Sequence, residues 1–188
     1  MSSGSGEVRI IGGQWKRTKL KVLDKPGLRP TPDRVRETLF NWLGQDLTNW
    51  TCVDAFAGSG VLGFECASRG ASDVLMMESD AALCGVLSDK IQALKAQGMR
   101  VQRGDALMGL RSLKPASVDL VFLDAPFDQP ALLEAALKAS VPCLKPQGHL
   151  YLECPQAQDE HALLSLGLEK HKYLKAGQVH AHLLRKIA

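Results

Sequence analysis

Acidic side chains recur where the hydrophobic runs of this sequence end. Asp54 follows the run TCV and precedes a glycine-rich loop, Glu78 ends DVLMME, and Asp124 follows VDLVFL. Two further acids stand in comparable places, Asp105 shortly after RVQR and Glu153 at the end of GHLYLE. Carboxylates accept hydrogen bonds and attract cations, so a site built from these residues favours a ligand with amino and hydroxyl groups.

The loop VDAFAGSGVLGFE contains Gly58, Gly60 and Gly63 in the G-x-G-x-x-G spacing of dinucleotide-binding folds. Glu78 lies about 20 residues further on, where the acid that binds a ribose is expected. Asp54, however, would repel a pyrophosphate at short range, and the loop contains no Lys or Arg to offset this. The loop therefore favours a ligand with a positive amino group and ribose hydroxyls but no phosphates, such as S-adenosylmethionine.

Each chemical group of S-adenosylmethionine can be matched to a residue predicted to bind it. Glu78 is expected to accept the ribose hydroxyls, and Asp105 to accept from the adenine amino group, with capping of the following helix as its alternative role. Gly58 and Gly60 let the backbone approach the methionine portion closely, whereas Gly63 is assigned to helix–strand packing. The full predicted set is Asp54, Phe56, Gly58, Gly60, Glu78, Asp105 and Ala106.

The segment DAPF, Asp124, Ala125, Pro126 and Phe127, is the predicted catalytic segment. A nucleobase amino group is a poor nucleophile, because its lone pair is delocalised into the ring. Asp124 and a backbone carbonyl of Ala125–Pro126 are expected to accept its two hydrogens, which directs the lone pair at the methyl group. Pro126 restricts Ala125 to extended geometry, and Phe127 offers a ring for the base to stack on. An ordinary β-turn is the alternative. For Glu153, substrate binding and attachment of the N-terminal helix both remain open.

Alternating strands and helices are predicted to position these residues. Strands are expected at 51–55, 73–78, 100–103, 118–123 and 148–153, and helices near 61–69, 80–97, 105–112 and 130–144. This pattern indicates a mostly parallel sheet covered on both faces, with ligands bound at the carboxyl ends of its strands. LGLEKHKYLKAG and QVHAHLLRK then predict a closing antiparallel hairpin, with His180 and His182 on one face of its second strand.

A basic arm precedes this region. Residues 7–36 contain nine Lys or Arg and three acids, a local charge of +6 in a chain whose net charge is +3. VRIIGGQWKRTKLKVL predicts a β-hairpin, and in RPTPDRVRETLFNWL we expect Thr31 to cap a helix with Pro32 at its first position. Such an arm indicates a polyanionic partner, and Arg29 and Arg36 have the alternative role of tying the arm helix to the rim of the site. The predicted RNA phosphate contacts are Arg9, Lys16, Arg17, Lys19, Arg34 and Arg36.

Length and composition narrow the class of protein. A chain of 188 residues, 45% hydrophobic, fits one domain with a full core. Its apolar runs are too short to span a bilayer and no signal-peptide pattern is present, so we expect a cytoplasmic protein without a membrane partner. Five widely spaced cysteines without a C-x-x-C pair, and histidines without ligand spacing, predict reduced buried thiols and no metal site.

Over almost its whole length the chain resembles a known family. RIIGGQWKRTKL, RPTPDRVRETLFNWL, DAFAGSGVLGFECASRGA, ESD, DAPF and YLEC are similar to segments of the bacterial small-subunit (16S) ribosomal RNA guanine-N2 methyltransferases of the RsmD type. The resemblance implies an α/β, Rossmann-like class I methyltransferase fold, with a mostly parallel seven-stranded sheet, a C-terminal antiparallel hairpin and a basic N-terminal hairpin and helix. It also implies methyl transfer from S-adenosylmethionine to N2 of one guanine in the 16S rRNA of the small ribosomal subunit.

The expected organisation is a flexible tail or cloning remnant at 1–6, the basic arm and helix at 7–45, and a methyltransferase domain at 46–188 with the arm packed on it, acting as a monomer. The family pattern is D-P-P-F, and Ala125 replaces its first proline, which retains the carbonyl but leaves the segment less rigid. Alternatives are methylation of adenine N6 or cytosine N4, a non-catalytic RNA-binding assembly factor on the same fold, and an oxidoreductase that binds a nicotinamide dinucleotide.

Overall fold

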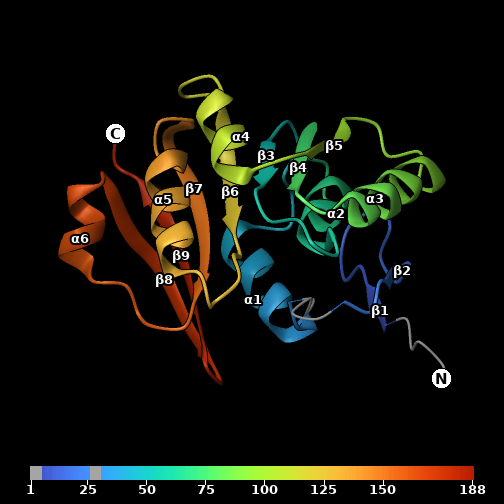
Figure 1. Cartoon of the computed structure of the whole chain (residues 1–188), viewed down its shortest axis with the longest axis horizontal. Coiled ribbons are helices and arrows are strands. Elements are labelled where there is room, and N and C mark those ends of the chain that lie inside the picture. The colour runs from blue at the N-terminus through green and yellow to red at the C-terminus, as the bar shows by residue number, and fades with distance from the viewer. Residues whose placement is uncertain (1–5, 26–30) are drawn as a thin grey trace.

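Seven strands form one sheet in the computed structural model, which describes residues 6–25 and 31–188 (Figure 1). Their order is β5-β4-β3-β6-β7-β9-β8. The strands are β3 (Thr51–Asp54), β4 (Asp73–Glu78), β5 (Met99–Arg103), β6 (Val118–Leu123), β7 (Leu144–Cys154), β8 (Leu168–Ala176) and β9 (Val179–Lys186). Strands β3 to β7 pair in parallel, and β9 pairs antiparallel with both β7 and β8. Because β3 lies between β4 and β6, the order of winding reverses beside it.

Helices cover both faces of the sheet. They are α1 (Asp33–Leu43), α2 (Val61–Ser68), α3 (Ala81–Ala93), α4 (Ala106–Ser112), α5 (Pro130–Ser140) and α6 (Glu160–Ser165). Successive strand residues point to opposite faces, so Cys52 and Phe122 join one apolar core with α1, α2 and α3. Val53 and Val121 join the other core with α4, α5 and α6. The predicted α/β fold with a mostly parallel, doubly covered sheet is thereby confirmed.

The predicted N-terminal hairpin is present as a separate two-stranded sheet, β1 (Gly6–Arg9) paired antiparallel with β2 (Lys19–Val22). In Figure 1 it lies near α1 and α3, at the opposite end of the molecule from β8 and β9. Its loop docks on the end of α2, where Gln14 N donates to Ser68 O at 2.7 Å and Ser68 Oγ donates to Gly12 O at 2.6 Å. Gly13, with φ +73°, is required here because a Cβ would lie 1.9 Å from the Ser68 carbonyl oxygen.

The elements differ from the predicted ones in several places. The helix expected at 80–97 ends at Ala93. The helix expected at 130–144 ends at Ser140, because β7 already begins at Leu144. Leu144 pairs with Val118 of β6, and the register of this pairing shifts between Val118 and Leu120. Helix α6 was not predicted. Helix α1 begins at Asp33 with Pro32 as its N-cap and no side-chain cap, so the cap predicted for Thr31 is wrong. Of the tail expected at 1–6, positions 1–5 lie outside the described residues, as does Arg29.

No helix within 6–25 and 31–188 is long and apolar enough to cross a membrane. All five cysteines are buried and carry free thiols. In the same part of the chain, no group of three or more His, Cys, Asp or Glu side chains is arranged to hold a metal ion.

Candidate active site

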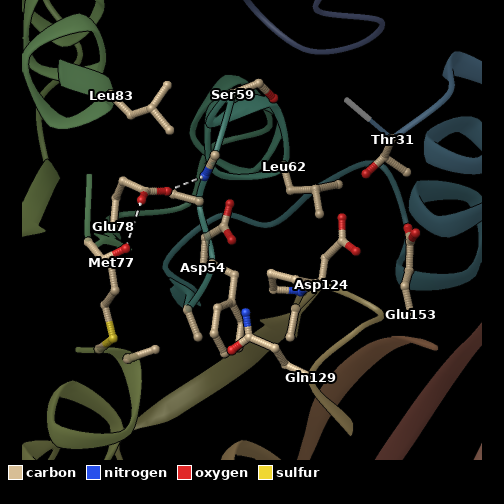
Figure 2. Close-up of a pocket in the computed structure, with 18 of the residues that line it drawn as sticks. Thr31, Asp54, Ser59, Leu62, Met77, Glu78, Leu83, Asp124, Gln129 and Glu153 are labelled. Atoms are coloured by element: carbon tan, nitrogen blue, oxygen red, sulfur yellow. Dashed lines mark hydrogen bonds between the residues drawn. The ribbon is translucent and has the colours of Figure 1, made fainter. Parts of the chain in front are cut away.

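A cleft of about 1190 Å³ opens at the carboxyl edge of the sheet. All five predicted strand-end acids line it, together with the predicted residues Phe56, Gly58, Ala106, Ala125, Pro126 and Phe127. Figure 2 shows Asp54 and Asp124 at its centre, with Glu78 on one side and Glu153 and Thr31 on the other. The topology explains this gathering, because parallel strands bring their carboxyl ends to one edge and the winding reverses between β3 and β6.

Gly60 is the predicted cofactor residue that does not line the cleft. It has φ +76°, and a Cβ there would lie 2.3 Å from Leu87 Cδ2. Gly60 therefore serves the turn into α2 and its packing against α3. Gly63 has the packing role predicted for it, since a Cβ would meet the Met76 side chain at 2.9 Å.

Acidic side chains far outnumber basic ones in the lining of the cleft. Its acidic lining residues are Asp54, Glu78, Asp80, Asp105, Asp124, Asp128 and Glu153. Among the described lining residues the only Lys or Arg is Lys25, and its amine is paired with Asp80. A dinucleotide pyrophosphate would face this field without cationic compensation, whereas a cationic ligand is attracted by it.

Asp54 is buried behind the glycine loop. Burial raises its pKa from the ordinary value of 3.8 to about 7; backbone N–H groups of Gly63 and Phe56 oppose this rise and the charge of Glu78 adds to it. The group therefore titrates near neutral pH, and a positive charge in the cleft would favour its ionised form.

Glu78 joins the glycine loop to the start of α3. Its Oε2 accepts from Gly58 N at 2.9 Å, and its Oε1 accepts from Asp80 N at 2.8 Å. Ser79 Oγ also donates to Oε1, at 3.4 Å. A carboxylate has about four lone-pair sites, so Oε2, which accepts only from Gly58, keeps one for a ligand hydroxyl. Asp105 has the helix-capping role considered for it, because Oδ1 accepts from Met108 N at 2.8 Å at the start of α4. It also lines the cleft, so both of its predicted roles are compatible with its position.

Asp124 and Glu153 follow the paired residues Leu123 and Leu152 of the neighbouring strands β6 and β7. Tyr151 donates its hydroxyl to Glu153 Oε1 at 2.6 Å. Burial raises the pKa of Asp124 well above its usual range, and the charges of Glu153 and Asp54 raise it further. Burial also raises the pKa of Glu153, which the Tyr151 hydrogen bond opposes. Asp124 and Glu153 therefore lie together in the lining of the cleft, and N–H donors of a ligand bound there would stabilise their ionised forms.

Arg36 is the predicted RNA contact that the structure contradicts. Its side chain is fully buried, with Nη1 2.5 Å from Glu65 Oε1 and Nη2 2.5 Å from Asp33 Oδ1. Nη1 also donates to the Arg9 carbonyl at 2.8 Å, and Glu65 pairs in turn with Arg69. A guanidinium held in this way does not reach an RNA backbone. Its contacts agree instead with the alternative role of tying the arm helix to the body of the protein.

The remaining predicted RNA contacts are exposed on the arm; they are Arg9, Lys16, Arg17, Lys19 and Arg34. Arg9 pairs with Asp33 at 2.7 Å and Lys19 with Glu7 at 2.8 Å. Ion pairs between exposed side chains are weak, so these cations stay available to a phosphate backbone.

Sequence reasoning missed Thr31 and Tyr151. Thr31 precedes α1, is buried and lines the cleft, while its carbonyl accepts from Arg36 Nε at 3.0 Å. The sequence indicated only a helix cap for Thr31, and no local pattern indicated that this residue lines the cleft. Tyr151 stands two residues before Glu153 on one strand, and that spacing, which puts both side chains on one face, could have revealed the pair.

The strand order, the antiparallel β9 and the acid-lined cleft at the switch point define a Rossmann-like class I methyltransferase fold. Residues 8–185 match the family described as "Conserved hypothetical protein 95", and the chain belongs to that family.

Named relatives support this assignment. The chain is 48% identical over 132 residues to "Ribosomal RNA small subunit methyltransferase D" of Escherichia coli strain K12. The aligned residues make up 70% of this chain and 66% of that protein, slightly less than two thirds of its length. The protein of the same name from Haemophilus influenzae is 42% identical over 158 residues, 80% of each chain. Among solved structures, the Escherichia coli protein yhhF matches with a TM-score of 0.84 and 39% identity, covering 97% of this chain and 99% of that one.

Proposed function

We propose that this chain transfers a methyl group from S-adenosylmethionine to the exocyclic N2 of a guanine in the 16S rRNA of the small ribosomal subunit, in the cytoplasm. The names of its relatives support the reaction and the RNA. The observation that carries the proposal is the cleft at the switch point, whose lining is acidic at every parallel strand end.

The residues of the cleft fit S-adenosylmethionine in their chemistry. Glu78 would accept hydrogen bonds from the ribose hydroxyls, and Asp105 would accept one from the adenine amino group. Asp54, which lies behind the glycine loop, would attract the positive charge of the methionine portion. When bound, S-adenosylmethionine supplies an electrophilic methyl group on a sulfonium and is left as a neutral thioether.

The DAPF segment would prepare the nucleophile. Asp124 accepts one hydrogen of the guanine amino group and a backbone carbonyl of Ala125–Pro126 accepts the other, so the nitrogen lone pair faces the methyl group. Phe127, a residue that is 39% exposed and lines the cleft, stacks on the base. The methylated amine would carry a positive charge, and its proton would pass to Asp124 or to water.

The arm would hold the RNA backbone. Arg9, Lys16, Arg17 and Arg34 are exposed cations on one N-terminal extension, a pattern that positions RNA without recognising its bases. We further propose that the arm at 7–45 and the domain at 46–188 act as one unit. Val8 and Leu20 of the hairpin are buried in the same apolar core as Cys52 of the sheet, which supports this.

Labelled methyl transfer tests the proposal. Unmodified small subunits, naked 16S rRNA and DNA are incubated with the enzyme and labelled S-adenosylmethionine, and the nucleosides are separated. We expect label in N2-methylguanosine from ribosomal RNA. Label in N6-methyladenosine or N4-methylcytidine would identify one of the alternative amino groups, and RNA binding without any label would identify an assembly factor. Calorimetry with S-adenosylhomocysteine and with NADH separates the methyltransferase from an oxidoreductase.

A further inference from the structure

Guanine differs from adenine and cytosine in the group beside the amine. On the Watson–Crick side of N2, guanine presents N1–H, which is a donor; N3, an acceptor, lies on the other side. Next to N6 of adenine and N4 of cytosine stands a ring nitrogen with a lone pair, which is an acceptor. A pocket that methylates guanine N2 therefore gains from a second acceptor beside the one that holds the amine, whereas the same acceptor repels the other two bases.

The structure contains a second acceptor near Asp124. Glu153 leaves β7 beside Asp124, which leaves β6, and both line the cleft (Figure 2). Glu153 is held by one oxygen, since Tyr151 donates to Oε1. Within the described residues no hydrogen bond is made by Oε2, so this oxygen is free for a ligand.

The other acids of the cleft are less suited to this task. Asp54 lies behind the glycine loop, where Phe56 and Gly63 donate to it through their backbone N–H groups. Glu78 uses both oxygens on backbone N–H groups, at the far side of Asp54 from Asp124 (Figure 2).

We propose that Glu153 recognises N1–H of the target guanine and so determines which base is methylated. The inference rests on the proposed function, because it takes Asp124 as the acceptor for the amine. Tyr151 acts as a positioning residue that fixes Glu153 without touching the base. A buried carboxylate that meets N1–H gains a hydrogen bond, whereas one that meets a ring lone pair is left without a partner, which is costly.

The decisive probe is 2-aminopurine at the methylated guanine of 16S rRNA, whose position is first located by digesting the labelled RNA into fragments. 2-Aminopurine keeps the N2 amine but lacks N1–H, so its N1 is an acceptor. With wild-type enzyme we expect kcat/KM for the 2-aminopurine substrate to fall about 10²-fold below that for guanine, because a site built to bind a hydrogen rejects an analogue that lacks it.

The variant Glu153→Gln tests whether Glu153 causes the preference for guanine over 2-aminopurine. The Tyr151 hydroxyl can still donate to the amide oxygen, so the amide N–H₂ replaces Oε2 and becomes a donor toward the base. We expect methylation of guanine to fall about 10²-fold and the preference over 2-aminopurine to shrink or reverse, with the affinity for S-adenosylhomocysteine unchanged. 2-Aminopurine also lacks O6 of guanine, so another residue that recognises O6 could cause the same preference in the wild type. A change of the preference in Glu153→Gln distinguishes the role of Glu153 from that of such a residue.

The outcomes are distinguishable from a failure of the proposed function. Equal rates on guanine and 2-aminopurine in the wild type, or an unchanged preference in Glu153→Gln, overturn the role of Glu153 while leaving the guanine methyltransferase intact. Absence of label in guanine overturns both.

Discussion

Arg36 and Glu65 form an ion pair in which both side chains are completely buried, with Nη1 2.5 Å from Oε1. Arg36 belongs to α1 and Glu65 to α2, so the pair joins the N-terminal arm to the helix that follows the glycine loop. Glu65 also accepts from the Ile11 backbone N–H at 2.8 Å, which brings the hairpin loop into the same network. The carbonyl of Thr31, a residue of the cleft, accepts from Arg36 Nε. The arm is therefore fixed to the site by buried polar contacts as well as by apolar packing.

Arg36→Ala should destabilise the protein by about 3 kcal/mol, the lower end of the usual cost of removing one partner of a buried ion pair, because Arg69 still pairs with Glu65. Urea unfolding measures the change. Arg34→Ala is the matched control, because Arg34 is an exposed arginine on the same helix, and we expect an effect within about 0.5 kcal/mol. If both variants lose the same small amount, the buried network does not hold the arm.

The strand ends and their acids could be predicted from the sequence because they depend on local pattern. Short apolar runs separated by helical segments indicate parallel strands, and such strands bring their carboxyl ends to one edge whatever the details of packing. The positions of Asp54, Glu78, Asp124 and Glu153 follow directly from this rule. The C-terminal hairpin was likewise signalled by two polar–apolar segments around a glycine.

The burial of Arg36 could not be predicted, because its partner Glu65 lies 29 residues away and the two meet only in the folded chain. An arginine in a basic segment looks the same whether it is solvated or paired. Gly60 illustrates a related limit. Its spacing matches a cofactor loop, yet a Cβ there would lie 2.3 Å from Cδ2 of Leu87 on another helix. The burial of Arg36 and the packing of Gly60 both depend on residues that are distant in the sequence.

Asp124→Ala should lower turnover about 10²-fold or more, the scale expected for loss of an aligned polar group in the transition state. The affinity for S-adenosylhomocysteine should change little, because Asp124 is placed against the base. Single-turnover methyl transfer and calorimetry provide the two measurements. Asp89→Asn, a change of an exposed acid on α3, serves as the control. Turnover near the wild-type value would remove Asp124 from the proposed mechanism.

Asp54 should make the ligand-free protein less stable as the pH rises. Because burial raises its pKa from 3.8 to about 7, the folded state binds this proton more tightly than the unfolded state does. Its contribution is therefore fully present below about pH 4 and is lost as the pH rises toward and through 7. The free energy of unfolding, measured from pH 4 to pH 8, should fall more steeply for the wild type than for Asp54→Asn. Parallel curves for the two proteins would contradict the raised pKa.

Lys16→Ala combined with Arg17→Ala should flatten the salt dependence of RNA binding. Each phosphate contact adds about 0.7 to 0.9 to the slope of log K against log salt, so loss of two contacts should reduce its magnitude by about 1.4 to 1.8. Filter binding of 16S rRNA over a range of salt concentrations measures the slope. Lys114→Ala is the control, because Lys114 is exposed in the loop before β6, at the edge of the sheet opposite the cleft. Since phosphate contacts position the RNA without recognising its sequence, the double variant should weaken binding to unrelated RNA by the same factor. A slope equal to that of the wild type would mean that the RNA backbone runs along another surface.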